Sequence, residues 1–460
     1  MGRFPDNFIV GAATAAHQVE GNNIHSDYWV MEHLKHTNFN EPSLDAVDHY
    51  NRYEEDIKLL AAAGLNAYRF SIEWARIEPK QGQYDKKEIE HYRKVLECCR
   101  ENGVEPVVTM MHFTSPVWVI KNGGWESEAT VTAFAKYCSY VIEELGDLMH
   151  YVVTINEANM GLQVAAIAER YKRQMMAKMK ADKAAKKFGK KSEESIEGTA
   201  QVGMNFNSML KNMFWQGFEN KKAFGTRSPQ TFVSSRTTEG DILVMRAHQA
   251  ARTAMKAVKP ELKIGLSLSL HDIQPIEGGE EAAKKEWDDE FTHYLPYIKE
   301  DDFFGLQNYT RSIIGADGIQ PVPAGAETTQ MDYEFYPQAL ANVVRKVDAE
   351  FKKLGVTMPI MVTENGIATD DDSRRIAFID QATKGLADCI TDGLPVIGYC
   401  YWSLLDNFEW QKGFSMRFGL IEVDRTTMKR SPKPSLTELG KVTGDGSKQW
   451  NLDRQKGTGV

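Results

Sequence analysis

The chain has 460 residues and a formal net charge of −9, and 42% of its residues are hydrophobic. The negative balance argues against a protein that binds nucleic acid or anionic membranes. No apolar stretch approaches the about 18 residues that a membrane-spanning helix needs, and the N-terminus lacks the apolar core of a secretory signal. We therefore expect a cytoplasmic protein that partners neither nucleic acid nor membrane.

The cysteines are few, odd in number and absent from any C-x-x-C pattern, so they predict neither a disulfide framework nor a zinc site. Their apolar surroundings indicate buried, inert thiols. No His/Asp/Glu cluster has ligand spacing, so we expect no metal and no cofactor. The five cysteines are Cys98, Cys99, Cys138, Cys389 and Cys400.

Along the chain, eight short apolar runs alternate with helical patterns, without a repeat or a Pro/Gly/Ser-rich linker. The runs are continuous, as in parallel strands that are buried on both faces. They cover Phe8–Ala13, Ala67–Ile72, Pro106–Met111, Tyr151–Ile155, Lys263–Leu270, Phe303–Gln307, Ile360–Thr363 and Val396–Tyr401. The helical patterns include Asp48–Ala63, Lys86–Asn102, Glu128–Leu145 and Asp241–Val258.

This alternation predicts the α/β class and a (β/α)8 TIM barrel. Barrels with long loops exceed 400 residues as one unit, so we expect a single domain over residues 1–460 with extended βα loops. The C-terminal tail, about residues 445–460, is expected to be flexible.

The residues just after each predicted strand should form the active-site rim. Carboxylates, amides, histidines and tryptophan rings lie there. Such side chains bind the hydroxyls and ring faces of a sugar well and are poor choices for stabilising the barrel. They are Gln18, Glu20, Glu73, Trp74, His112, Asn156, Glu157, His271, Asn308, Tyr309, Glu364, Asn365, Trp402, Glu409 and Trp410.

Two of these carboxylates, Glu157 and Glu364, end the fourth and seventh predicted strands. Groups on those strands can face each other across the barrel mouth, and two facing carboxylates are what glycoside hydrolysis requires. A single Glu in such a place could instead cap the next helix. Two of them, each after a buried strand and each beside an Asn, favour the catalytic interpretation.

Six segments in order give the chain a resemblance to glycoside hydrolase family 1, the β-glucosidase family. They read FPDNFIVGAATAAHQVEG, AYRFSIEWARIEP, HFTSPVWV, TINEAN, TENGI and YWSLLDNFEWQKGFSMRFGLIEVD. The resemblance implies a retaining β-glycosidase that cleaves terminal β-linked glucose, galactose or fucose. It would act in two steps, through a covalent glycosyl-enzyme.

The resemblance also implies residue roles. Glu157 would be the acid/base and Glu364 the nucleophile, supported by Arg69, Asn156 and Tyr309. The sugar hydroxyls would be held by Gln18, His112, Glu409 and Trp410, with Trp402 as the apolar floor and Phe418 shaping the pocket. The peptide bond after Trp402 is expected to be cis.

Two positions refine this resemblance. Ala158 stands where the family usually has Pro, and the loss of that Pro is expected to loosen the turn after Glu157. The branch of the family that cleaves 6-phosphosugars carries Ser, Lys and Tyr where this chain has Glu409, Met416 and Phe418. We therefore expect an unphosphorylated substrate.

A basic, Met-rich segment, Glu169 to Glu194, is expected to be a solvated helix outside the barrel rather than a surface for an acidic partner. Apolar residues near it are expected in the core, with an aglycone-binding role as the alternative. These are Met175, Met176, Met179, Phe214, Trp215 and Phe218.

Other functions stay open at this point. A transglycosylase would use the same residues, and a catalytically weak sugar-binding barrel would usually lack one of the two Glu residues. A metal-dependent barrel enzyme is a weaker alternative. The sequence also leaves open whether the protein forms a homo-oligomer.

Overall fold

The computed structural model describes residues 3–187 and 203–443, and the side chains up to residue 180 in the first range. The predicted C-terminal tail and the end of the basic segment lie outside this part. Eight parallel strands close into a barrel, which confirms the predicted fold class. In chain order the strands are β1 (Ile9–Ala13), β2 (Ala67–Ser71), β3 (Glu105–Met111), β4 (Tyr151–Ile155), β5 (Lys263–Ser269), β7 (Phe303–Gln307), β10 (Ile360–Asn365) and β11 (Val396–Trp402).

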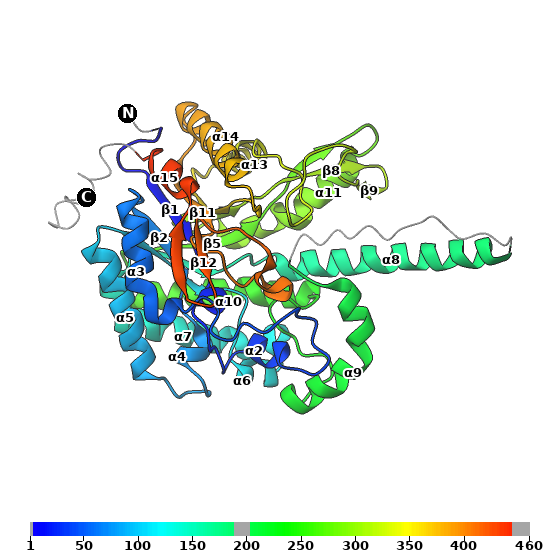
Figure 1. Cartoon of the computed structure of the whole chain (residues 1–460), viewed down its shortest axis with the longest axis horizontal. Helices are drawn as coiled ribbons and strands as arrows, with labels where there is room; N and C mark the ends of the chain where they lie inside the picture. Colours follow the sequence, from blue (N-terminus) through cyan, green and yellow to red (C-terminus); the bar gives the residue numbers. More distant parts are fainter. Residues whose placement is uncertain (1–2, 188–202, 444–460) are drawn as a thin grey trace.

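Each barrel strand is followed by at least one helix before the next barrel strand begins, and most of these helices surround the barrel (Figure 1). Two of these helices end beside glycines, Gly64 and Gly103, that adopt the left-handed conformation. The helices around the barrel are α3 (His49–Ala62), α5 (Lys86–Glu101), α7 (Glu128–Leu145), α10 (Thr238–Val258), α12 (Leu295–Ile298), α13 (Ala339–Lys353), α14 (Asp372–Thr391) and α15 (Pro434–Gly440).

The barrel interior is filled at its N-terminal end, so the opposite end is left to form a cavity. Six side chains from six strands pack together there, each from the first three residues of its strand and each at most 2% exposed. They are Ile9, Ala67, Val107, Val153, Phe303 and Met361. The register Ile9 to Gly398 closes the barrel between its first and last strands.

The loops at the C-terminal end carry further elements, of which the sequence predicted only the basic helix. A three-stranded sheet joins β6 (Asp272–Pro275), β8 (Arg311–Gly315) and β9 (Gly318–Ile319), and β12 (Ile421–Asp424) pairs with β13 (Lys429–Pro432). The remaining helices are α1 (Ala16–Val19), α2 (Asp27–Glu32), α4 (Trp74–Ile77), α6 (Val117–Lys121), α8 (Met160–Lys187), α9 (Phe206–Phe224) and α11 (Glu280–Glu290). Short 3-10 turns cover Gly124–Glu126, Gly146–Leu148, Thr292–Tyr294 and Trp410–Ser415.

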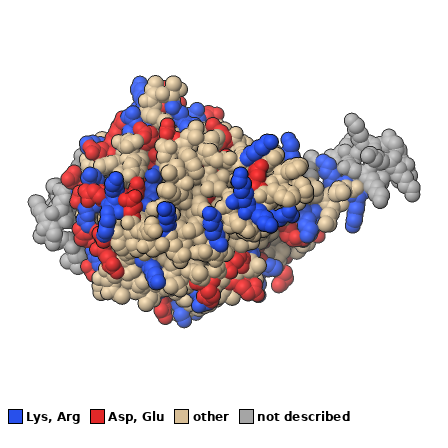
Figure 2. Space-filling model, turned by 90° about the horizontal axis from the view of Figure 1, so that it is seen from below, with Lys and Arg blue, Asp and Glu red and all other residues tan. Residues whose placement is uncertain are grey.

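Helix α8 leaves the barrel after β4 and projects well beyond the other elements (Figure 1). Lys and Arg side chains lie along the described part of this arm (Figure 2). This confirms a solvated basic helix as far as Lys180, the last residue of α8 whose side chain is described. The expectation that the nearby apolar residues are core is wrong, because Met176, Met179, Phe214, Trp215 and Phe218 are 44–65% exposed.

The five cysteines all lie in the described part, where each is buried and none is paired. Burial raises the pKa of every one of these thiols, as expected for inert groups. Among the described residues, every helix is too short or too polar to cross a membrane.

Candidate active site

A cavity of about 910 Å³ opens at the C-terminal ends of the strands, where the barrel interior is not filled. Nine of the eleven residues proposed from the sequence line it. They are His112, Asn156, Glu157, Tyr309, Glu364, Trp402, Glu409, Trp410 and Phe418. The other two, Arg69 and Gln18, are fully buried behind the wall and hydrogen-bond to lining residues.

Glu364 ends β10, and its carboxylate accepts two short hydrogen bonds. Arg69 Nη1 donates to Oε1 at 2.5 Å, and the Tyr309 hydroxyl donates to Oε2 at 2.6 Å. Burial raises the pKa of Glu364, while the charge of Arg69 and both hydrogen bonds act against this rise. The environment therefore favours the ionised form as far as a buried site allows.

Asn156 is the centre of a hydrogen-bond network behind the two glutamates. Its Oδ1 accepts from Arg69 Nη2 and from Gln307 Nε2, both at 2.6 Å. Its Nδ2 must then donate, and it does so to His112 Nε2 at 3.1 Å. Burial, reinforced by Arg69, lowers the pKa of His112 well below its ordinary value. A neutral His112 with Nε2 as acceptor carries its proton on Nδ1, which has no hydrogen-bond partner among the described residues.

Glu157 follows β4 in the left-handed conformation, with φ of 44°. A residue other than glycine keeps this conformation only where its surroundings enforce it. Its N–H donates to Ser267 Oγ at 3.2 Å on the neighbouring strand. Burial, together with the charges of Glu364 and Glu409, raises the pKa of Glu157 well above its ordinary value.

Ala158 holds this turn in a way that a proline could not. Its N–H donates to the Ser267 carbonyl at 3.0 Å, and its carbonyl accepts from Arg236 Nη1 at 2.8 Å. Proline has no N–H to donate, so the first bond exists because the position is Ala. The expectation of a looser turn overlooked this tie between Ala158 and β5.

Glu409 lines a polar corner of the cavity, and the buried Gln18 contacts it from behind the wall. Gln18 Nε2 lies 3.3 Å from Glu409 Oε2 and donates to the Phe408 carbonyl at 2.8 Å. Burial, reinforced by the charge of Glu364, raises the pKa of Glu409 to about 8. The Gln18 Oε1 atom, like His112 Nδ1, has no partner within the described part of the chain.

Aromatic rings form the rest of the wall. The indole of Trp402 stacks near the His112 ring at 5.6 Å, and Phe418 meets Tyr309 edge-on at 6.2 Å. The Trp402–Ser403 peptide bond is cis, as the resemblance implied. Trp410 packs against Tyr28, with ring centroids 5.1 Å apart.

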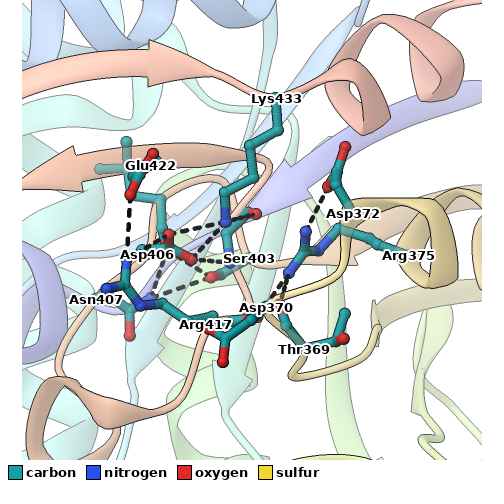
Figure 3. A network of polar contacts seen from close by, with 12 residues as sticks. Thr369, Asp370, Asp372, Arg375, Ser403, Asp406, Asn407, Arg417, Glu422 and Lys433 are labelled. Atoms are coloured by element: carbon teal, nitrogen blue, oxygen red, sulfur yellow. Dashed lines mark hydrogen bonds and ion pairs between the residues drawn. The ribbon is translucent and has the colours of Figure 1, made fainter.

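A network of ion pairs fixes the loop that carries Glu409 and Phe418 (Figure 3). Asp406 accepts from Lys433 Nζ at 2.8 and 2.9 Å and from the Gly419 N–H at 2.8 Å. Arg417 Nη1 lies 3.4 Å from the same carboxylate, and Lys433 also donates to the Gly419 carbonyl at 2.9 Å. The loop is thereby tied to the segment after β13.

Some predicted rim residues do not line the cavity. Glu20 pairs with Arg76 at 2.8 Å, Glu73 accepts from Thr114 at 2.7 Å, and Trp74 is a core residue. They serve the packing of the barrel because a strand end can point outward as well as inward.

Other lining residues were missed by the sequence reasoning. They include Met160, Gln163 and Val164 on the first turns of α8, and Gly203, Met204, Val233 and Leu270 from other loops. Met160 follows Glu157 by three residues, and Gln163 and Val164 follow Met160 by three and four, a helical spacing that could have identified them. The methionines and aromatics proposed for the aglycone site, which include Met179 and Trp215, are not among the residues that line this cavity.

The parallel barrel, and a polar and aromatic cavity with two buried carboxyl groups at its C-terminal mouth, define the class of retaining β-glycosidases. The chain belongs to glycosyl hydrolase family 1, whose family model matches residues 1–224 and 299–443.

Individual relatives agree over nearly the whole chain. A β-glycosidase structure, BGL167, is 40% identical, covers 97% of this chain and 98% of its own, and superposes with a TM-score of 0.82. A β-glucosidase structure, 1317, is 36% identical over 95% of this chain and 98% of its own, with a TM-score of 0.80. A 1,4-beta-D-glucan glucohydrolase from Thermotoga neapolitana is 28% identical over 95% of this chain and 97% of its own length.

Proposed function

We propose that this enzyme hydrolyses the terminal bond of unphosphorylated β-glucosides and related β-glycosides, with Glu364 as nucleophile and Glu157 as acid/base. One observation carries the assignment. Arg69 and Tyr309 both donate to Glu364, and these bonds act to lower its pKa. The pKa of Glu157, in contrast, is raised well above its ordinary value by burial and by neighbouring carboxylates. Of two carboxyls that share a buried site, Glu157 therefore keeps the proton and Glu364 is the anion.

In the first step, a Glu364 carboxylate oxygen bonds to the anomeric carbon while the bond from that carbon to the aglycone oxygen breaks. The proton of Glu157 passes to the departing oxygen. In the second step, water attacks the anomeric carbon and gives its proton to Glu157. The ester to Glu364 breaks, and the sugar leaves with its original configuration.

The sugar would be held in part by a donor and an acceptor that have no partner among the described residues. His112 Nδ1–H can donate to a hydroxyl, and Gln18 Oε1 can accept from one. Asn156, fixed by Arg69 and Gln307, would contact the 2-hydroxyl, where bonding strengthens in the transition state. Glu409 and Trp410 would hold the remaining hydroxyls.

The apolar face of the sugar would lie on Trp402, and Phe418 would bound the pocket beside it. Glu409 beside Phe418 and Met416 favours an unphosphorylated sugar, since no cation stands at position 416. The relatives named β-glucosidase and 1,4-beta-D-glucan glucohydrolase support glucose as the sugar in the cavity.

The five unpaired, buried thiols suit a reducing compartment, and we place the enzyme in the cytoplasm on that ground. Transglycosylation is the second candidate, because the glycosyl-enzyme can be captured by a sugar hydroxyl in place of water.

The test is to incubate the enzyme with 4-nitrophenyl β-D-glucoside and follow both nitrophenol release and free glucose. Equal amounts indicate hydrolysis, whereas a deficit of glucose with new disaccharide indicates transfer. The proposal would be refuted if the enzyme released nitrophenol from none of three substrates, a nitrophenyl β-glucoside, β-galactoside and β-fucoside.

A further inference from the structure

The aromatic side chains of α9 face away from the protein. Phe214, Trp215 and Phe218 are 44–64% exposed, and their ring centroids lie 5.2–6.3 Å from one another. Scattered apolar residues are normal on a protein surface, whereas a contiguous group of large ones marks an interaction site. The three rings are not among the residues that line the catalytic cavity, so the reaction does not account for them.

Helix α9 is held to the protein by polar side chains instead. Asn212 donates to the Thr37 carbonyl at 2.8 Å, and Glu219 accepts from the backbone N–H and the ring of His36 at 3.1 and 2.6 Å. A helix on a globular protein normally turns its apolar stripe to the core and its polar stripe to water. The middle of α9 reverses this arrangement, which leaves its aromatic face open to another surface.

Lysines share the exposed side of α9 with these rings. Since a helix turns by about 100° per residue, the lysines and the three rings fall within one arc of about 120°. The lysines are Lys211, Lys221 and Lys222. Arg227, in the turn after the helix, adds a cation 4.2 Å from the centre of the Phe218 ring. These three rings and four cations form the aromatic–basic face of α9.

The net charge of −9 does not describe this face. Charges in salt solution are screened over about 8–10 Å, so a partner senses the charges near the contact rather than those of the whole chain. Helix α9 lies at the lower edge of Figure 1, and Figure 2, which views the molecule from below, shows Lys and Arg gathered near the base of the projecting arm. The expectation of no membrane partner rests on the charge of the whole chain and does not extend to this face.

The charges decide which occupant the face fits. A symmetric pair of copies would bring the same cations face to face, where they would repel one another. An anionic lipid surface suits both kinds of side chain, because Trp and Phe settle at the level of the headgroups while Lys and Arg attract the headgroup phosphates and carboxylates.

We propose that the aromatic–basic face of α9 binds the surface of an anionic membrane and holds the enzyme on the bilayer without crossing it. This inference does not depend on the proposed function. Binding to vesicles tests it, measured by co-sedimentation of the enzyme with phosphatidylcholine vesicles that do or do not contain phosphatidylserine. The wild-type enzyme should bind the mixed vesicles at least about tenfold more tightly than pure phosphatidylcholine, and added salt should weaken this binding.

One pair of variants tests the rings. Phe214→Ser combined with Trp215→Ser should weaken binding to the mixed vesicles at least about tenfold, because less apolar surface enters the bilayer. The matched control combines Ile276→Ser with Leu354→Ser, which are 50% and 48% exposed and lie outside α9. This control should bind within about twofold of the wild type. Unchanged melting temperatures show that both variants fold.

A second pair tests the cations. Lys221→Ala combined with Lys222→Ala removes two charges from the last turn of α9, which should weaken binding about tenfold or more. Lys352→Ala combined with Lys353→Ala removes two charges from the last turn of α13 and is the control with the same net charge. It should bind within about twofold of the wild type.

Four outcomes would overturn the inference. They are no binding of the wild type to the mixed vesicles, equal binding to vesicles without phosphatidylserine, losses in the controls that match those in α9, and binding that survives the loss of both rings. Sedimentation of the free enzyme adds a fifth. A dimer that the Phe214→Ser and Trp215→Ser combination dissociates would assign the face to a second copy of the chain.

Discussion

Arg69 Nη1 lies 2.5 Å from Glu364 Oε1, and both side chains are almost completely buried. The same guanidinium reaches Asn156 with its other nitrogen, so one buried cation fixes both the carboxylate and the neighbouring amide. Burying a charge pair costs desolvation energy, so such a pair is weak evidence for stability and suggests a functional role. In the proposed mechanism this pair favours Glu364 as the anion beside a protonated Glu157.

Substitution of the two glutamates should separate their roles. Glu364→Gln should show no measurable turnover of any β-glycoside, because no glycosyl-enzyme can form. Glu157→Ala should lose about 10²- to 10⁴-fold on substrates with poor leaving groups and much less on dinitrophenyl glycosides, which need little proton donation. Added azide should restore part of the second variant's rate and yield a β-glycosyl azide. Equal losses on all substrates, without azide rescue, would contradict the assignment.

Removal of the Tyr309 hydroxyl should shift the pH profile on its acidic side. This hydroxyl lowers the pKa of Glu364, so Tyr309→Phe should raise that pKa. Because the reaction needs ionised Glu364, the acidic limb of kcat/KM should move to higher pH. A hydrogen bond to a charged group is worth about 1.5–3 kcal/mol, or about one to two pH units. The basic limb should move less.

Tyr28→Phe is the control for this shift. Tyr28 also lines the cavity and packs on Trp410, but the hydrogen bonds to Glu364 come from Arg69 and Tyr309. Its variant should leave the acidic limb in place. If the two variants shift the limb equally, the hydrogen bond from Tyr309 does not set the pKa of the nucleophile.

Phosphorylation of the substrate should be strongly unfavourable. A 6-phosphate removes the 6-hydroxyl donor and brings nearly two negative charges into a buried site that already holds the carboxyl groups of Glu364 and Glu409, whose crowding contributes to the raised pKa of Glu409. Lost hydrogen bonds plus repulsion should cost on the order of 4 kcal/mol, about a thousandfold in kcat/KM. Side-by-side values for 4-nitrophenyl β-glucoside and its 6-phosphate check this. Comparable values would overturn the substrate class and leave the two-glutamate mechanism standing.

The Asp406–Lys433 pair should stabilise the loop beneath Glu409. Asp406→Asn removes the carboxylate that Lys433 contacts, and Lys433→Met leaves the buried Asp406 with only the more distant Arg417, so each should lower the free energy of unfolding, by at most about 3–5 kcal/mol. The double variant should lose less than the sum of the two. Urea unfolding measures this, with Lys58→Met in the exposed Lys58–Glu54 pair as the control that should change little. Strictly additive losses would show that the pair is not coupled.

The barrel could be predicted from sequence because parallel strands buried on both faces form continuous apolar runs. The predicted run Phe303–Gln307 is the observed β7, and Ile360–Thr363 differs from β10 only by the polar Glu364 and Asn365 at its end. The short strands β6, β8 and β9 escaped because runs of two to five residues in long loops carry no clear period.

Site residues could be predicted where they belong to a recognisable motif. They could not be predicted where only the packing of the folded chain determines which way a side chain points. Motifs identified Glu157 and Glu364 as candidates. Glu20 and Glu73 also follow predicted strands, but they bond to Arg76 and Thr114 and do not line the cavity. The basic residues of α8 predicted a solvated helix, but the sequence could not show that its apolar residues are exposed as well, with Met179 65% exposed. Apolar residues are usually buried, and only the tertiary structure shows where they are exposed instead.

Trapping the covalent intermediate is the most direct test of the account. A 2-deoxy-2-fluoro-β-glucoside with a dinitrophenyl leaving group should form the glycosyl-enzyme quickly and release it slowly, because fluorine destabilises the oxocarbenium-like transition states and the good leaving group spares only the first step. Intact mass should rise by one fluoroglucosyl unit, and peptide mapping should place the label on Glu364. A label on Glu157, or nitrophenol release without any label, would contradict Glu364 as the nucleophile.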